Sequence, residues 1–322
     1  MTRLILRSTA ILVGSALVGS VAVFALLRLL PGDIASLILG EHASADQLAA
    51  LRADLGLNRS WIEQYMGWIE GIGRGDLGQS FARGYDIFNE IRVRFGLTFS
   101  IAIASMLFSW ALALALGTYA AMHERRVRGE LVDVVAQLGL AVPSFWLGLL
   151  LVWFASVRMG WFPAGGYIPW TESVTGAVRT LTLPTLAVSA SLVAINTRYV
   201  RAAMIDVLKQ DYIRTAMSKG QTLRRAAMKH GLRNASVALV TIGVLQLGGL
   251  LAGVVVIENV FVLPGLGRML VEAVAGREII VVQSLAFLIL LLVLILNFLL
   301  DIVHGMIDPR IRDAESLTGT GL

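Results

Sequence analysis

The sequence contains no cysteine, which excludes disulfide bonds, thiolate metal sites and cysteine nucleophiles together. Charged residues are also scarce: they make up 15% of the 322 residues, whereas a soluble domain carries about a quarter. Hydrophobic residues make up 57%, which is the composition of a membrane protein. The net charge of +5 therefore does not indicate nucleic-acid binding, because lysine and arginine accumulate in the cytoplasmic loops of membrane chains.

The motifs of common catalytic and nucleotide sites are absent from the sequence as well. It has no G-x-x-x-x-G-K-[ST] phosphate loop, no H-E-x-x-H and no G-x-S-x-G. The glycine-rich segment 71–78 follows no strand pattern and opens no helix pattern, which argues against a dinucleotide site. The four histidines lack metal-ligand spacing. We therefore expect no catalytic residue, no metal and no bound cofactor, which leaves transport, channel and scaffold functions.

Long apolar segments, in contrast, are abundant. A helix needs about 20 apolar residues to cross the hydrocarbon core of a bilayer. We predict an all-α integral membrane protein with six transmembrane helices, near residues 8–30, 95–122, 131–157, 181–199, 235–257 and 279–302. The first segment could be read as a signal peptide, but its apolar run is too long and lacks a clear cleavage site, so we expect an uncleaved helix.

The distribution of basic residues orients these helices. Arginine and lysine gather before the first helix, between the second and third, between the fourth and fifth, and after the sixth. The positive-inside rule then places both termini in the cytoplasm, and an even number of helices requires the same. The predicted regions are the first helix (1–30), an extracytoplasmic insertion (31–94), a five-helix core (95–303) with a cytoplasmic loop at 200–234, and a cytoplasmic tail (304–322).

The insertion is predicted to be helical. The segments 44–47 (SADQ) and 60–63 (SWIE) have the spacing of capping boxes at helix starts. The second is followed by an amphipathic aromatic stripe that includes Trp61, Tyr65 and Trp68. Such a stripe more often packs a small subdomain or rests at the headgroup level than binds a ligand.

The loop between the fourth and fifth helices contains a patterned basic stretch, DYIRTAMSKGQTLRRAAMKHG, from residue 211 to 231. One face of its first half is apolar at helical spacing: Ile213, Ala216, Met217 and Gly220. Gly220 can end this helix in the left-handed conformation, and Thr222 can cap a second short helix. A loop that only carried charge would need neither an apolar face nor a glycine break, so we predict that a partner docks there.

This stretch resembles the EAA loop of ABC importer permeases, whose pattern is Glu-Ala-Ala, three residues, then Gly. Arg214, Thr215 and Ala216 stand in the first three places and Gly220 in the last. The departure at the glutamate is typical of the dipeptide/oligopeptide/nickel (peptide/opine/nickel uptake) permeases. Further similar segments follow in order along the chain: LLPGD (29–33), LRADLGLNRSWIEQYMGW (51–68), GDLGQSF (75–81), VPSFWLGLLL (142–151), FVLPGLGRMLVEAV (261–274) and DPRIR (308–312).

The resemblance implies the first-named permease subunit of an ATP-driven, binding-protein-dependent importer in the inner membrane of a bacterium or archaeon. Its partners would be a second homologous permease, two cytoplasmic ATPases that hold ATP and magnesium, an extracytoplasmic substrate-binding protein and membrane lipid. Candidates for docking the binding protein are Trp61, Tyr65 and Trp68. The coupling helix seated on one ATPase would comprise Asp211, Tyr212, Ile213, Arg214, Thr215, Ala216, Met217, Ser218, Lys219 and Gly220.

Polar and helix-breaking residues at membrane depth are candidates for a solute pathway or gate, because amide and ionisable side chains there usually face a bundle interior or a cavity. These candidates are Asn196, Gln246, Glu258, Asn259, Pro264, Gly265, Gly267, Gln283 and Asn297. The alternative for each polar residue is an interhelical hydrogen bond. The break in FVLPGLG predicts an outer re-entrant element, because irregular backbone at that depth must be buried or line a cavity.

Three alternatives to a peptide importer stay open. The same machine could carry nickel chelates, opines or another small solute, since the resemblance places specificity largely in the binding protein. A stand-alone secondary transporter or channel would predict inverted repeats, and the sequence shows no repeat. A membrane scaffold or receptor would not transport at all.

Overall fold

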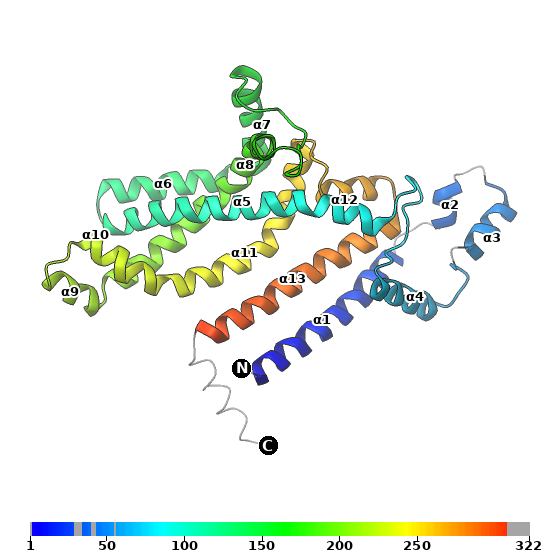
Figure 1. Cartoon of the computed structure of the whole chain (residues 1–322), viewed down its shortest axis with the longest axis horizontal. Helices are drawn as coiled ribbons and strands as arrows, with labels where there is room; N and C mark the ends of the chain where they lie inside the picture. Colours follow the sequence, from blue (N-terminus) through cyan, green and yellow to red (C-terminus); the bar gives the residue numbers. More distant parts are fainter. Residues whose placement is uncertain (1, 29–33, 40–42, 55, 308–322) are drawn as a thin grey trace. The chain divides into compact units, whose positions relative to one another are not determined.

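The computed structural model describes residues 2–28, 34–39, 43–54 and 56–307, and these residues are predominantly helical (Figure 1). None of them forms a strand beyond an isolated antiparallel bridge between Gln79 and Asp86. The LLPGD and DPRIR segments, and most of the predicted tail, lie outside the described residues.

Four helices are each long and apolar enough to cross a membrane: α1 (Thr2–Arg28), α5 (Ile87–Met122), α8 (Val174–Leu208) and α13 (Ile279–Ile307). Two bent pairs could each supply one more span. One joins α6 (Val127–Ala141) to α7 (Ser144–Leu151) and η1 (Val152–Arg158), and the other joins α10 (Leu223–Ala226) and η2 (Ala227–Gly231) to α11 (Leu232–Val260). The described residues therefore hold four to six candidate spans, which reach the predicted six if each bent pair is one span.

The third predicted span is not a continuous helix. It bends by 93° between α6 and α7, and the residue at the bend, Val142, has an extended backbone with φ −84° and ψ 118°. Pro143 explains the break, because its ring disfavours helical geometry in the preceding residue and it has no backbone N–H to donate. The second span also differs from its prediction: α5 begins at Ile87, before residue 95.

The chain divides into two compact units, which we describe separately. Unit 1 comprises Met1–Gly96 with Arg268–Phe298, and unit 2 comprises Leu97–Gly267 with Leu299–Leu322. The boundaries fall within α5, α12 (Leu266–Ala275) and α13.

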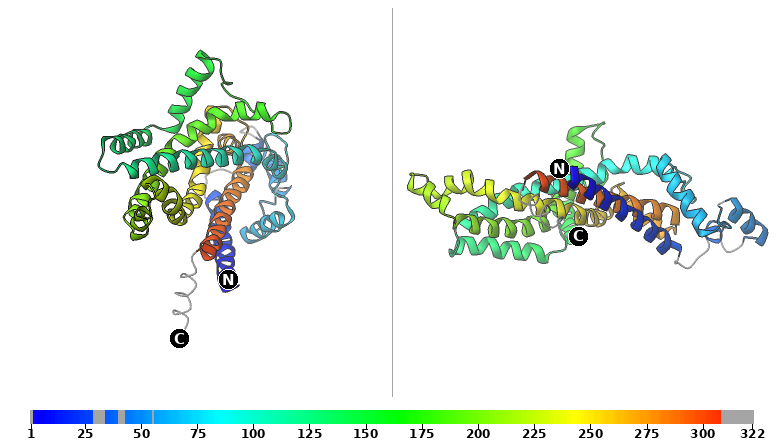
Figure 2. Two further views of the ribbon diagram at one scale, coloured as in Figure 1. Left: turned by 60° about the vertical axis from the view of Figure 1, so that its left-hand side comes forward. Right: turned by 90° about the horizontal axis from the view of Figure 1, so that it is seen from below.

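In unit 1, α1 and α13 lie side by side (Figures 1 and 2). The helices approach closely at Gly19, where an added Cβ would meet the side chain of Leu290 at 2.3 Å. The insertion contributes α2 (Ile34–Leu39), α3 (Ala45–Asp54) and α4 (Trp61–Arg74). Both predicted capping boxes are present: Ser44 pairs with Gln47, and Ser60 pairs with Glu63 at the start of α4.

In unit 2, the core lies among α5, α7, α8 and α11. Its largest fully buried side chains include Ile101 of α5, Leu183 of α8 and Phe261 at the end of α11. Pro184 is buried inside α8, which continues through it. A second cluster around Val200 and Met204 packs the ends of α8 and α5 against η2 and the start of α11. The short helix α9 (Asp211–Ser218) lies at the far end of this packing (Figure 2).

Candidate functional site

The predicted coupling segment forms a short helical hairpin. Helix α9 ends at Ser218, and Gly220 takes the left-handed conformation with φ +83°. The hydroxyl of Thr222 then accepts a hydrogen bond from the backbone N–H of Arg225 at 3.3 Å and caps α10. The helix, the glycine turn and the second cap all occur as the local sequence predicts. We call residues 211–226 the coupling hairpin.

The buried side of the coupling hairpin is used within the chain. Ile213 and Ala216 are buried against Ala226 of α10, with Leu208 and Leu223 packed around them. The prediction that the whole apolar face receives a partner is therefore wrong for Ile213 and Ala216. Helical periodicity reveals that a face will be covered, but it does not distinguish a neighbouring helix of the same chain from an external partner.

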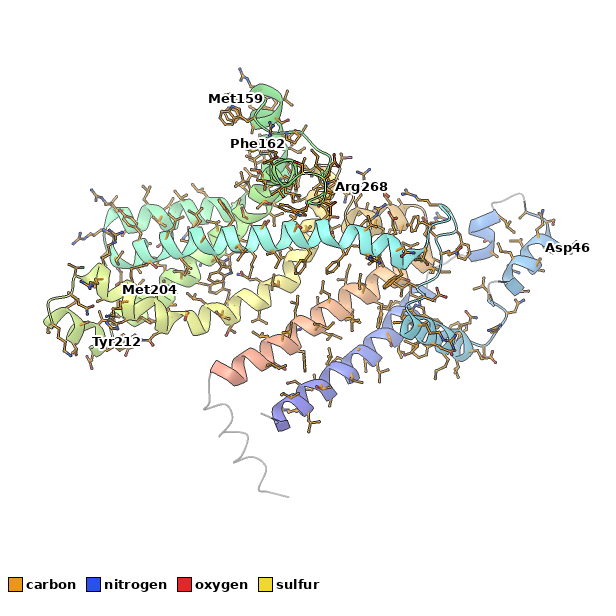
Figure 3. All side chains as sticks on the ribbon, viewed as in Figure 1. Asp46, Met159, Phe162, Met204, Tyr212 and Arg268 are labelled. Atoms are coloured by element: carbon orange, nitrogen blue, oxygen red, sulfur yellow. The ribbon has the colours of Figure 1, made fainter. Side chains whose placement is uncertain are left out.

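The flanks of α9 remain exposed. Tyr212 is 39% exposed and Met217 is 44% exposed, and they border the buried pair on either side. Figure 3 shows Tyr212 near the end of unit 2 that holds α9, whereas Met204 is fully buried. The outward side of the helix carries Arg214, Thr215 and Ser218, all exposed. The surface that α9 offers is thus a polar face bordered by two large apolar side chains.

A second candidate region surrounds Glu258, near the end of α11. This side chain is 0% exposed, and one carboxylate oxygen accepts a hydrogen bond from the hydroxyl of Thr98 at 2.5 Å. The same hydroxyl accepts from the backbone N–H of Leu266, the first residue of α12, at 2.9 Å. At Gly265 an added Cβ would lie 2.1 Å from the carboxyl group, so the carboxylate occupies space that only glycine leaves free. We call this arrangement the Glu258 clasp.

The backbone between α11 and α12 turns sharply beside the clasp. Val262 has φ +52°, which is a rare and strained conformation for a β-branched residue. Gly267 lies against α11, where an added Cβ would be 2.5 Å from the Cα of Val255. Pro264 is exposed, and the exposed Asn259 donates its side-chain amide to the carbonyl of Val255 at 2.8 Å. The structure therefore brings Glu258 and Gly265 together, whereas Asn259 bonds to its own helix.

Two of the intramembrane amides form an interhelical network in unit 2. Asn196 of α8 is fully buried and accepts a hydrogen bond from Gln246 of α11 at 2.7 Å. It also donates to the hydroxyl of Ser109 in α5 at 3.4 Å. These contacts favour the interhelical hydrogen-bond interpretation of both amides over the pathway interpretation. Asn297 is separate from them, in the unit 1 part of α13, and is exposed.

The aromatic stripe of α4 divides between packing and exposure. The hydroxyl of Tyr65 shares a 2.8 Å hydrogen bond with Ser20 of α1, and its ring contacts Phe24 edge-on. Trp68 packs against Phe24 and Phe287. Trp61 is 63% exposed. Most of the stripe therefore packs a subdomain, and Trp61 is its free aromatic surface.

Trp68 also shares a cavity with a residue from the opposite end of the sequence. It is distinct from a second cavity, of about 520 Å³, which lies between α5, α6 and α8 and is lined mainly by apolar side chains. The cavity at Trp68 is smaller, about 320 Å³, and Gln283 of α13 lines it together with Trp68. Two candidates that the sequence placed in different roles thus meet at one site.

The segment between α4 and α5 is tied to α12 and to the residue that precedes α13. Arg83 donates to Glu272 at 2.8 Å, and Arg268 donates to the other oxygen of this carboxylate at 2.9 Å. Burial by itself would raise the pKa of Glu272, but the hydrogen bonds and charges of Arg268 and Arg83 outweigh it and lower that pKa. Ser80 bonds to Glu278, which adds a second tie. We call this set of contacts the insertion clamp.

Sequence reasoning missed a polar groove between α6 and α8. Asp133 forms an ion pair with Arg201 at 3.1 Å, and Arg198 and Tyr199 line the same cavity of about 670 Å³. The signal for it was an aspartate inside an otherwise apolar predicted span. Within the part of the chain that the structure describes, no cluster of three or more histidines and acidic residues could hold a metal ion.

Comparisons with known proteins agree along nearly the whole chain. Residues 113–313 match the family model described as "Binding-protein-dependent transport system inner membrane component", and residues 1–102 match the model for the N-terminal part of such membrane components. A "Putative peptide transport system permease protein" of Brucella abortus (strain 2308) is 37% identical over 97% of this chain and 99% of its own length. The "Glutathione transport system permease protein GsiC" of Escherichia coli (strain K12) is 37% identical over 91% of this chain and 93% of its own length.

A solved structure shares the fold. It is described as "Inward facing conformations of the MetNI methionine ABC transporter", with a TM-score of 0.57 and 16% identity. The match covers 68% of this chain and 96% of the other. At this identity the likeness concerns the fold alone.

Proposed function

Since this chain belongs to the family of binding-protein-dependent transport system inner membrane components, we propose that it is one of two permeases in an ABC importer of di- and oligopeptides. The proposal that the cargo is a peptide rests on the near full-length similarity to a protein named for peptide transport and to one named for glutathione transport. Glutathione is itself a tripeptide, so both names indicate short peptides. Glutathione-like tripeptides are therefore included in the proposed cargo.

The chain is a membrane component and not an enzyme, and ATP hydrolysis belongs to separate subunits of the transporter. We assign its partners as a second homologous permease, two cytoplasmic ATPases that bind ATP and magnesium, and an extracytoplasmic substrate-binding protein. Both termini would be cytoplasmic and residues 31–94 extracytoplasmic, in the inner membrane of a bacterium or archaeon. The distribution of basic residues supports this orientation.

In this proposal the coupling hairpin passes motion from an ATPase to the spans. Burial of Ile213 and Ala216 makes α9 and α10 one packed element, and the hairpin is joined to α8 on one side and, through η2, to α11 on the other. A packed element moves as a body between discrete arrangements, so displacement of the hairpin would shift α8 and α11 together. ATP binding can shift that equilibrium only as far as its affinities for the two states differ.

The Glu258 clasp is the proposed gate. It holds the start of α12 and the end of α11 to α5 through the single hydroxyl of Thr98, next to the strained turn at Val262. Strained backbone persists where the surroundings fix it, and it is common at switching regions. Opening would require Thr98 to release either Glu258 or Leu266.

Reconstitution tests the proposal. The chain, tagged and expressed with the products of neighbouring genes, should co-purify with a second permease and two ATPases. In liposomes the complex should take up labelled dipeptides or tripeptides only with ATP and the matching binding protein. Uptake without ATPases would contradict the importer, and a nickel chelate or opine found in the purified binding protein would contradict the peptide cargo alone.

A further inference from the structure

The cavity that Trp68 shares with Gln283 lies wholly within unit 1. It is bounded by α4, by Phe24 in the last turn of α1, by residues 76–78 and by Ile280 and Gln283 in the first turns of α13. We call it the insertion pocket. Its volume of about 320 Å³ is at the lower end of the range for small-molecule sites, roughly 300–1,000 Å³. The insertion pocket is therefore large enough for a small solute or a head group.

Two largely buried residues with polar groups line the insertion pocket, Trp68 and Gln283. The indole N–H of Trp68 is buried and has no hydrogen-bond acceptor among the described residues. Gln283 is 8% exposed and lines the same pocket. Buried polar groups in native proteins are nearly always hydrogen-bonded. The unpartnered N–H of Trp68, in a pocket that Gln283 also lines, indicates that a molecule outside the chain bonds there.

The rim of the insertion pocket carries charges of both signs. Arg59 contributes a guanidinium group, and Glu63 and Asp76 contribute carboxylates, all three exposed. One oxygen of Glu63 accepts from the backbone N–H of Ser60 at 2.9 Å, and one oxygen of Asp76 accepts from the backbone N–H of Gly78 at 2.9 Å. Each carboxylate accepts several hydrogen bonds, so both retain capacity for a ligand.

We propose that the insertion pocket binds a small zwitterion, a molecule with an ammonium group and an anionic oxygen. The anionic oxygen accepts hydrogen bonds from the indole N–H of Trp68 and from Arg59. The ammonium group donates to the carboxylates of Glu63 and Asp76, and the amide of Gln283 bonds to either end. Free amino acids, short peptides and the head group of phosphatidylethanolamine share this chemistry. The proposal does not depend on the cargo proposed above, because it concerns binding without transport.

The wall of the insertion pocket offers a direct way to fill it. Gly67 of α4 lines the pocket, and an added Cβ there would meet no atom within 4 Å. Gly67→Leu therefore places a side chain in the pocket without displacing the core. Gly73 lies on the same helix, is equally open and does not line the pocket. Gly73→Leu is a matched control for the change in helix propensity and surface hydrophobicity.

The first experimental arm measures binding of dialanine to the purified transporter complex in phosphatidylglycerol nanodiscs, without ATP, by calorimetry. Dialanine should bind to the wild type and to Gly73→Leu with equal affinity. Its affinity for Gly67→Leu should be lower by about tenfold or more. N-acetyl-alanyl-alanine amide, which has no charges, should not bind. Trp68→Phe removes only the N–H, and Gln283→Leu removes only the amide. Both variants should weaken the binding of dialanine. They take the place of Gly67→Leu if that variant does not assemble.

The second arm uses nanodiscs that contain phosphatidylethanolamine and detects retained lipid by native mass spectrometry. If the head group is the natural occupant, wild type and Gly73→Leu should retain this lipid, Gly67→Leu should not, and dialanine should compete poorly. If a solute is the occupant, dialanine should bind equally in both bilayers. Absence of binding in both arms, or binding that Gly67→Leu leaves unchanged, would overturn the proposal. Loss of peptide uptake with binding intact would contradict only the proposed cargo.

Discussion

Thr98 connects two buried polar groups that belong to different elements, and this makes its hydroxyl a sharp test of the Glu258 clasp. Thr98→Val keeps the shape of the side chain but removes the donor to Glu258 and the acceptor for the N–H of Leu266. Losing a buried hydrogen bond in this way costs about 1–3 kcal/mol. We expect a lower melting temperature for the purified complex, whereas Thr98→Ser should melt like the wild type. Equal melting of the valine variant would show that the clasp does not hold the turn.

Gly220 tests the geometry of the coupling hairpin without touching its packing. Its φ is +83°, and an added Cβ would meet no atom within 4 Å, so a substitution there acts on the backbone alone. Left-handed geometry costs a residue with a Cβ roughly 1–2 kcal/mol, and asparagine tolerates it better than most. Gly220→Val should reduce peptide uptake per ATP hydrolysed in proteoliposomes, and Gly220→Asn should largely preserve it. A valine variant that couples normally would remove the hairpin from the coupling route.

Glu272 gives the insertion clamp a defined dependence on pH. Its pKa is lowered by Arg268 and Arg83 against the opposing effect of burial, so the unfolded segment takes up its proton at a higher pH than the folded one. The interaction of Glu272 with the two arginines therefore adds stability above the ordinary glutamate pKa. This stability is lost as the pH falls through the lowered pKa of the folded state. Hydrogen exchange of residues 76–86, corrected for intrinsic rates, should show constant protection from pH 7 down to the ordinary glutamate pKa and falling protection only below it. In Glu272→Gln the same segment should be poorly protected throughout, and a wild-type segment insensitive to acid would contradict the clamp.

At the scale of elements, α9 separates the residues that hold the hairpin from those that we propose meet a partner. Met217 is 44% exposed on a flank of the helix, whereas Ser218 is exposed on its outward side. Met217→Asp should leave the chain in the membrane but reduce co-purification of the ATPases, because it places a charge in an apolar contact. Ser218→Asp adds the same charge one residue away and should affect assembly less. If both variants retain the ATPases fully, Met217 is not part of the contact.

How well the sequence predicts an element depends on how local its causes are. The capping boxes at Ser44 and Ser60, the left-handed Gly220 and the Thr222 cap involve neighbours within a few residues, and all four appear as expected. The break at Pro143 is local too, but its 93° angle depends on the packing of α7 against α8 and α11. The cover of Ile213 and Ala216 by α10 of the same chain did not follow from the sequence, because amphipathicity does not identify what covers a face.

At the scale of the whole chain, the sites depend on residues far apart in sequence. Thr98 bonds to Glu258 and Leu266, and Trp68 and Gln283 line one cavity; neither pairing follows from any local pattern. Glu258 and Gln283 were found as polar residues at membrane depth, which identifies a candidate without its partner. Thr98 carried no such signal, because threonine is common in apolar helices. The long-range part of each site therefore required the fold.

The lack of cysteine makes the membrane topology directly testable, because a single introduced cysteine is the only target for a maleimide. Arg74, in the insertion, and Ser218, in the coupling hairpin, are both exposed. In spheroplasts a membrane-impermeant maleimide should label Arg74→Cys at once and Ser218→Cys only after lysis. Labelling of both from one side would contradict the proposed orientation.

The same labelling decides whether the bent pair of α6 with α7 and η1 is one span. Arg126 precedes α6, and the exposed Met159 follows η1. If the pair crosses the bilayer despite its 93° bend, Met159→Cys should be labelled from outside and Arg126→Cys only after lysis. Labelling of the two from the same side would make the pair re-entrant. The number of spans would then be odd if the pair containing α11 crosses, and the two termini could no longer share a side.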